Sequence, residues 1–229
     1  MPKDTVVIIP AYNEEHSIAK VINEIPRENV IAIIVVDNNS SDNTARQASE
    51  AGAITLSETS KGYGSACLKG ISYIEQLEVK PYIVVFLDGD YSDYPAQLSL
   101  LTQPIYENGY DLVIGSRMRG NVEKGALTIQ QKLGNKLASL LLKTMYNAHY
   151  TDLGPFRAIK YASLLKINMK DKTFGWTVEM QIKAAKLKMK TCEVPVNYRK
   201  RIGFSKISGT VKGTLMAGYK IIFTMFKYL

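Results

Sequence analysis

The sequence predicts an α/β protein built on a mostly parallel central sheet flanked by helices. Short, continuous runs of β-branched and other apolar residues recur through residues 1–115, and helical segments separate them. Unbroken apolar runs are typical of strands that are buried on both faces, whereas half-exposed strands alternate apolar with polar residues. Ligands of such sheets bind beyond the carboxyl ends of the strands, so the polar residues at those ends are the candidates for a functional site.

The first half of the chain alternates strands with helices. Capping residues mark several helix starts, such as Ser41 or Asp42 before one helix and Pro95 in the first turn of another. In chain order we expect strand Thr5–Ile9, helix His16–Glu24, strand Ile31–Val36, helix Thr44–Ala51, a weaker strand Ala53–Leu56, helix Gly64–Leu77, strand Tyr82–Leu87, helix Pro95–Glu107 and strand Asp111–Gly115.

The second half is less regular, and its polar segments are basic. It contains a Pro/Gly turn at residues 151–157 and a cluster of basic residues at 198–206 that leads into the last helix. The expected elements are a long, Leu-rich helix Thr128–Tyr146, a helix around Trp176–Leu187, a strand Thr191–Val196 and a final helix of roughly Gly209–Leu229.

Charge is divided unevenly along the 229 residues. The net charge is +8, but residues 1–115 carry a net charge of −9 and residues 116–229 carry +17. The two halves therefore face different partners. Cys67 and Cys192 lie far apart with no CxxC spacing, and there are only 2 His residues, so we expect neither a zinc site nor a disulfide framework. We also expect no signal peptide, and no apolar stretch reaches the ~18–20 residues of a membrane-spanning helix.

The sharpest feature of the sequence is Asp88-Gly89-Asp90, directly after a predicted buried strand. Two carboxylates on either side of a flexible Gly can reach one divalent cation, and Mg²⁺ characteristically takes one or two carboxylates together with substrate phosphates. The alternative is an ordinary turn, because this tripeptide is common between elements. A second acidic strand end, at Asp37, favours the metal site.

Three further strand-end features are candidates for ligand contacts. Asp37 could hydrogen-bond a nucleotide or could belong to the cap of the next helix. Glu14 could join it, although a Glu at a helix start is common. The Lys61–Ser65 stretch (KGYGS) matches neither a P-loop nor a dinucleotide-binding fingerprint, and its glycines could simply let the backbone approach a ligand.

Taken in order, these pieces resemble the family 2 glycosyltransferases of the GT-A fold. The later pieces are similar to the branch that makes dolichyl- or polyprenyl-phosphate sugars, and the resemblance covers nearly the whole chain. The matching pieces are residues 9–14 (IPAYNE), 35–42 (VVDNNSSD), 61–64 (KGYG) and 88–90 (DGD), then 115–117 (GSR), 151–158 (TDLGPFRA), 176–184 (WTVEMQIKA) and 194–210.

The resemblance implies a role for each matching residue. Asp90, with Asp88, would bind Mg²⁺ or Mn²⁺ at the diphosphate of a nucleotide-sugar donor. Synthases of this branch often carry Gln where this chain has Ser92, which leaves the third metal contact open. The implied substrate contacts are Pro10, Tyr12, Glu14, Asp37, Lys61, Gly62, Asp88, Gly89, Arg117, Asp152, Trp176, Arg199, Ser205 and Lys206, and the implied catalytic group is Asp88, Asp90, Arg117, Glu179 and Arg201.

The acceptor decides whether the reaction needs a base. A sugar hydroxyl must lose a proton to a positioned carboxylate, for which Glu179 and Asp152 are candidates. A lipid phosphate is already an anion and needs cations, which Arg117, Arg199 and Arg201 could supply. We expect an inverting transfer of a hexose from a UDP- or GDP-sugar to a polyprenyl or dolichyl phosphate. The runner-up is a soluble family 2 enzyme acting on a carbohydrate or small-molecule hydroxyl.

The final helix carries Lys212, Lys220 and Lys227 within one sector of roughly 80°. It could pack on the core with a solvated lysine stripe, or it could lie at an anionic membrane surface. We therefore expect residues 1–208 to form the transferase domain (1–115 for nucleotide and metal, 116–208 for acceptor), with 209–229 as an amphipathic helix. The expected location is cytoplasmic and peripheral at the inner face of the membrane.

Two other classes of protein fit less well. A nucleic-acid-binding protein would explain the basic half, but no reader motif accompanies it and the acidic half would repel a phosphate backbone. A non-catalytic nucleotide-sugar sensor would share the donor site without turnover. The nucleotide, the sugar and the oligomeric state are not indicated by the sequence.

Overall fold

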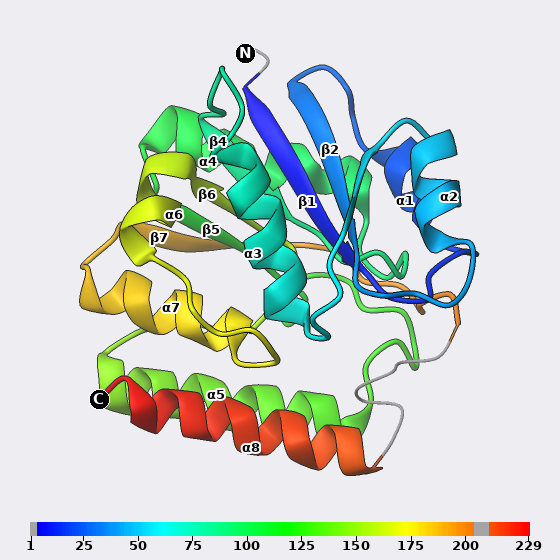
Figure 1. Ribbon diagram of the computed structural model, residues 1–229. Coiled ribbons are helices and arrows are strands. Elements are labelled where there is room, and N and C mark those ends of the chain that lie inside the picture. Colours follow the sequence, from blue (N-terminus) through cyan, green and yellow to red (C-terminus); the bar gives the residue numbers. More distant parts are fainter. Residues whose placement is uncertain (1–3, 204–210) are drawn as a thin grey trace.

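The computed structural model describes residues 4–203 and 211–229, with side chains at all of these positions except 211, 212 and 214. Its described strands form one seven-stranded sheet in the order β3-β2-β1-β4-β6-β5-β7 (Figure 1). The strands are β1 (Thr5–Ala11), β2 (Val30–Asp37), β3 (Ile54–Ser57), β4 (Ile83–Phe86), β5 (Leu112–Ser116), β6 (Arg157–Lys160) and β7 (Thr191–Pro195).

The sheet is mostly parallel, as the sequence predicts. Strands β1, β2, β3 and β4 pair in parallel, and so do β5 and β7. The exception is β6, which runs antiparallel between β4 and β5. The sequence pattern predicts a turn at residues 151–157 and does not predict this strand, because β6 is only four residues long and has a charged residue at each end. The following helix α6 (Tyr161–Ile167) was also missed.

Helices cover both faces of the sheet. Successive residues of β1 alternate between two cores: Val6 and Ile8 face one, and Val7 and Ile9 face the other. Helices α3 (Tyr63–Ile74), α6 and α7 (Trp176–Lys186) pack on the first face. The second face is covered by α1 (Ile18–Glu24), α2 (Thr44–Glu50) and α4 (Leu98–Asn108), the last preceded by the short 3-10 turn η1 (Pro95–Gln97).

Two long helices form an outer layer beyond α7. Helices α5 (Ile129–Tyr146) and α8 (Val211–Lys227) lie side by side and both contact α7 (Figure 1). Helix α5 starts at a capping box, in which the Thr128 hydroxyl accepts the Gln131 N–H and the Gln131 side chain accepts the Thr128 N–H. None of the described helices is both long and apolar enough to cross a bilayer.

Candidate active site

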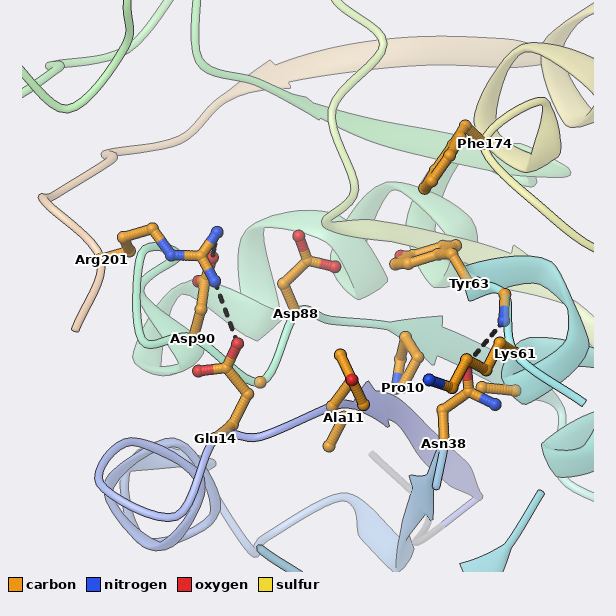
Figure 2. Close-up of a pocket in the computed structure, with 14 residues that line it drawn as sticks. Pro10, Ala11, Glu14, Asn38, Lys61, Tyr63, Asp88, Asp90, Phe174 and Arg201 are labelled. Atoms are coloured by element: carbon orange, nitrogen blue, oxygen red, sulfur yellow. Dashed lines mark hydrogen bonds and ion pairs between the residues drawn. The ribbon is translucent and has the colours of Figure 1, made fainter. Parts of the chain in front are cut away.

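A cavity of about 290 Å³ opens at the carboxyl ends of β1, β2 and β4 (Figure 2). Because these strands are parallel neighbours, the loops that follow them meet at one edge of the sheet. Most of the cavity wall consists of residues that the sequence analysis selected. They are Pro10, Tyr12, Glu14, Lys61, Gly62, Asp88, Gly89, Asp90 and Arg201, and the wall also includes Ala11, Asn38, Tyr63, Ala66 and Phe174.

Asp90 is buried, and Asp88 is half-buried with its Oδ1 atom withdrawn from solvent. One oxygen of Asp90 accepts the backbone N–H of Ser92 at 2.9 Å and its hydroxyl at 2.5 Å. Ser92 therefore orients Asp90. Burial raises the pKa of Asp88 to about 7, and the neighbouring Asp90 charge raises it further. Asp88 Oδ1 is buried without a hydrogen-bond partner among the described residues.

Arg201 places a cation between two carboxylates of the cavity. Its guanidinium lies 3.0 Å from Asp90 Oδ2 and 3.0 Å from Glu14 Oε1 (Figure 2). Glu14 is held in place by the Ser17 hydroxyl, which donates to its other oxygen at 3.0 Å. The pair of carboxylates thus already accommodates one positive charge at the edge of the sheet.

The Lys61–Gly62 turn is fixed by Asn38 at the end of β2. The Asn38 side chain accepts the Gly62 N–H at 2.7 Å and donates to the carbonyls of Glu58 and Ser60. Gly62 has a φ of 145°, a conformation that side-chain-bearing residues rarely adopt. The Lys61 ammonium lies over the Tyr12 ring, 5.6 Å from its centroid. A lysine and an aromatic face therefore form one side of the cavity.

Arg117 and Asp152 form a bidentate ion pair outside this cavity. Arg117 Nε and Nη2 lie 2.8 and 2.7 Å from the two oxygens of Asp152, which is fully buried. Asp152 thereby orients Arg117 and is saturated by it. Arg117 in turn lowers the pKa of Asp88, against the larger effect of burial, so its charge is felt at the cavity.

Glu179 does not reach the cavity, which corrects its expected role as a base. The side chain is fully buried in α7, where it accepts the backbone N–H groups of Lys170 and Asp171. Lys183 Nζ lies 2.6 Å away and the Tyr228 hydroxyl donates to it at 2.6 Å. A carboxylate with so many donors is a structural anchor.

Three more predicted contacts lie outside the cavity wall. Trp176 is 1% exposed and packs edge-on against Phe86 in the core, so it is not available to a sugar. Arg199 pairs with Glu24 at 2.7 Å and covers an aromatic ring, 3.4 Å from the centroid of Tyr91. Asp37 is nearly buried at the end of β2, one residue before the cavity-lining Asn38.

The lysines of the last helix do not form one solvated stripe. Lys220 turns toward the protein and pairs with Asp171 at 3.0 Å. Lys227 remains exposed. The side chain of Lys212, like the predicted phosphate contacts Ser205 and Lys206, lies outside the described residues. The expectation of three outward-facing lysines therefore fails at Lys220.

Phe174 and Asn38 are cavity residues that sequence reasoning did not select. Asn38 directly follows a strand-end carboxylate, which was an available signal. Phe174 reaches the cavity from the loop between α6 and α7 (Figure 2). No local pattern marks that loop, since its approach to Gly62 depends on how α7 packs.

The cavity residues fit a hard divalent cation. Asp88 and Asp90 offer oxygen ligands, and one buried oxygen of Asp88 has no partner. Within residues 4–203 and 211–229 there is no cluster of three or more His, Cys, Asp or Glu that could hold a metal by itself. Mg²⁺ sites commonly combine one or two carboxylates with substrate phosphates, so two carboxylates can suffice.

A mostly parallel sheet with a cavity lined by charged side chains at the carboxyl ends of its strands defines an α/β protein that binds ligands at that edge. Residues 6–168 match the family model described as glycosyl transferase family 2. The chain belongs to glycosyl transferase family 2. The family and the enzyme class predicted from the sequence, a glycosyltransferase, are thereby confirmed.

Two curated relatives and one solved structure illustrate the likeness. Glycosyltransferase AglJ of Haloferax volcanii is 30% identical over 201 residues, which cover 87% of this chain but only 64% of the relative. The undecaprenyl-phosphate mannosyltransferase of Micrococcus luteus is 30% identical, and the match covers 91% of this chain and 89% of the relative.

The solved structure is glucosyl-3-phosphoglycerate synthase from Mycobacterium tuberculosis in complex with Mn²⁺, UDP and glucosyl-3-phosphoglycerate. Its TM-score is 0.77 at 21% identity, and the match covers 99% of this chain and 80% of that chain. At this identity the likeness is one of fold, and it confirms the predicted GT-A fold class.

Proposed function

We propose that this glycosyltransferase moves a hexose from a UDP- or GDP-sugar to a polyprenyl phosphate, with inversion at the anomeric carbon, at a membrane surface. The observation that carries the proposal is a second cavity of about 240 Å³, an apolar groove between α5 and α8. Leu137, Leu141, Ile221 and Ile222 line the groove, and Arg117 forms part of its wall. An apolar chain with a phosphate at its head matches this arrangement.

Arg117 lines the groove, and its charge also acts on Asp88 in the donor cavity. The positive charge of Arg117 lowers the pKa of Asp88. Asp152 binds only the Nε and Nη2 side of the Arg117 guanidinium. Guanidinium groups bind phosphate oxygens well because their donors are planar and permanently charged. Arg117 would therefore hold an acceptor phosphate at the wall of the groove, where its charge also acts on Asp88.

Asp88 and Asp90 would hold Mg²⁺ or Mn²⁺ against the diphosphate of the donor. When bound, the ion neutralises the charge that develops on the leaving nucleoside diphosphate. Ser92 keeps Asp90 oriented, and Lys61 and Arg201 add positive charge to the cavity wall. The complex of the solved neighbour with Mn²⁺ and UDP supports this cofactor and donor class.

The surroundings of the two candidate bases favour a phosphate acceptor over a hydroxyl. Asp152 is engaged by Arg117, and Glu179 is engaged by backbone amides, Lys183 and Tyr228. Neither carboxylate lines the donor cavity. A phosphate acceptor arrives as an anion and needs no base. The name of the Micrococcus luteus relative also specifies a polyprenyl phosphate.

The outer surface of α5 and α8 supports docking at an anionic membrane. On α5, Ile129, Leu133, Leu137 and Leu140 are exposed beside the exposed Lys132, Lys136 and Lys143. On α8, the exposed apolar side chains are Leu215, Met216, Tyr219, Ile222, Phe223 and Phe226. We call these two sets the α5–α8 face. Apolar side chains flanked by lysines are typical of helices that lie in a membrane interface.

A donor and acceptor screen tests the proposed reaction. UDP- and GDP-sugars are incubated with Mn²⁺ or Mg²⁺ and with a short polyprenyl phosphate, a sugar alcohol or 3-phosphoglycerate, and products are identified by mass spectrometry. We expect metal-dependent transfer to the polyprenyl phosphate, with inverted anomeric configuration by NMR. Transfer only to a hydroxyl acceptor would establish the runner-up function. Binding without any transfer would indicate a sensor.

A further inference from the structure

The loop at residues 168–175 lies between α8 and the donor cavity. On the cavity side, the carbonyl of Lys172 accepts the backbone N–H of Ser65 at 3.0 Å. A Cβ added to Gly62 would lie 2.1 Å from that carbonyl oxygen, and one added to Gly64 would lie 2.0 Å from the carbonyl oxygen of Asp171. Since the two backbones are in direct contact, the position of this loop fixes the turn that carries Lys61 and Tyr63.

On its other side, the same loop is held by carboxylates that α8 reaches. Glu179 accepts the N–H groups of Lys170 and Asp171 at 3.0 and 2.7 Å. Asp171 closes the loop on itself by accepting the N–H groups of Thr173 and Gly175 at 2.7 and 3.2 Å. These bonds leave little freedom for Phe174, which lies inside the loop and lines the cavity.

Helix α8 contacts this arrangement through one polar stripe. Lys220 and Thr224 of α8 and Tyr228 directly after it follow one another at a spacing of four residues, which places them on one side of the segment. Lys220 Nζ lies 3.0 Å from Asp171 Oδ2, and the Tyr228 hydroxyl donates to Glu179 Oε1 at 2.6 Å. Between them, Thr224 Oγ1 would lie 2.4 Å from a Cβ added to Gly175. The stripe therefore contacts the loop at Asp171 and at its end, Gly175, and it also contacts Glu179, which anchors the loop.

We propose that Lys220 and Tyr228 are positioning residues for the donor cavity: by holding Asp171 and Glu179 they fix the 168–175 loop, and through it Phe174 and the Lys61–Tyr63 turn. The placement of α8 against the protein then sets the affinity for the nucleotide. By linkage, nucleotide binding favours the docked position of α8 to the same extent. This inference rests on the proposed donor cavity.

The test compares Lys220→Gln/Tyr228→Phe with a matched control, Lys227→Gln/Tyr219→Phe. The control removes the same groups from exposed positions of the same helix. Affinity for UDP and GDP in the presence of Mn²⁺ is measured by calorimetry, and donor KM and kcat are measured separately. Acrylamide quenching of Trp176, the 1 Trp of the chain, reports on the loop and the start of α7 without any ligand.

We expect the stripe variant to bind nucleotide about 5- to 20-fold more weakly, with a matching rise in donor KM and kcat within about twofold. Trp176 should become more accessible to quencher in this variant and not in the control. Tyr228→Phe alone keeps the ring and should show a smaller change in the same direction.

Equal nucleotide affinity in wild type and the stripe variant would overturn the positioning role. A fall in kcat with unchanged affinity would overturn it as well. If wild type itself binds neither UDP nor GDP, the donor cavity is refuted, and the positioning role is refuted with it. Equal affinity or a fall in kcat alone would overturn the positioning role and leave the proposed function intact. Only a wild type that binds no nucleotide would overturn both.

Discussion

The donor cavity and the α5–α8 face are opposites in chemistry. The cavity encloses Asp88, Asp90 and Glu14, together with a guanidinium, at the edge of the sheet. The α5–α8 face exposes leucines, phenylalanines and lysines on two outer helices. The acidic first half of the chain supplies the carboxylates of the cavity, and the basic second half supplies the lysines of the face. The uneven charge along the sequence is therefore partly a separation in space, with Arg201 of the second half as an exception inside the cavity.

The inner and outer sides of helix α8 carry different kinds of side chain. Its inner side combines the polar Lys220 and Thr224 with the apolar Ile221 and Met225, which pack against the core. Its outer side exposes Tyr219, Phe223 and Phe226. A helix on the surface of a water-soluble protein normally has polar side chains on its outer side. The exposed aromatic side chains of α8 are therefore the feature on which our proposal of a membrane-docked α5–α8 face depends.

Loss of the Asp90 charge should have the largest effect on the cavity. We expect Asp90→Asn to lower turnover at least about 100-fold, because charge stabilisation by a bound metal is worth several kcal/mol. The matched control is Glu107→Gln, an exposed carboxylate on α4. Steady-state assays with saturating Mn²⁺ give the result. Turnover close to wild type in Asp90→Asn would remove this carboxylate from the reaction.

Acidic residues placed on the α5–α8 face should weaken its proposed binding to membranes. We expect Leu133→Glu/Phe223→Glu to reduce partitioning onto anionic vesicles at least about tenfold, since each apolar side chain contributes about 1.5–3 kcal/mol when buried. Val79→Glu is the control, because Val79 is 76% exposed and lies between α3 and β4, outside the α5–α8 face. Flotation assays measure the partitioning, and equal recovery of both variants would contradict a membrane role.

Neutralising lysines on α5 should have a smaller effect that depends on salt. We expect Lys132→Gln and Lys136→Gln each to weaken binding to anionic vesicles about fivefold at low ionic strength and to leave neutral vesicles unaffected. Lys69→Gln, an exposed lysine on α3, serves as the reference. The same measurement at high salt should abolish the difference. A loss on neutral vesicles would mean that the lysines act through packing.

The smallest expected effect concerns stability at the cavity. Burial raises the pKa of Asp88 to about 7, above its value in the unfolded chain. At a pH between the unfolded and the folded pKa, Asp88 is therefore protonated in the folded state and ionised in the unfolded state. Folding stability is therefore lost as the pH rises through this window. Without metal, Asp88→Asn should melt several degrees higher than wild type at pH about 8, and the gain should shrink toward pH about 5.

A carboxylate with the opposite shift provides the control for this measurement. Although burial opposes it, hydrogen bonds from the Lys190 N–H and the Ser163 hydroxyl hold the pKa of Asp111 below its usual value. Asp111→Asn should therefore destabilise the protein above the unfolded pKa. Equal, pH-independent melting changes in both variants would contradict the assignment of a protonated Asp88.

The strand-end residues could be predicted because each is set by its immediate sequence. A buried strand followed by Asp88-Gly89-Asp90 places both carboxylates at the edge of a parallel sheet wherever the helices lie. The strand β6 could not be predicted, because its four residues are sheltered by neighbours from distant parts of the chain. Nor could the role of Glu179, since its partner Tyr228 is 49 positions away. The inward Lys220 was missed for the same reason.

The most direct test of the account is sugar transfer to a long-chain polyprenyl phosphate carried in anionic vesicles. Wild type and Leu133→Glu/Phe223→Glu are assayed on this acceptor and on a short-chain polyprenyl phosphate in solution, with metal and the donor found by the screen. We predict that wild type uses both acceptors and that the variant keeps its rate on the soluble one while losing most of its rate on vesicles. Equal rates of both proteins on vesicles, or no transfer to either lipid phosphate, would contradict a donor cavity served by a membrane-docked acceptor groove.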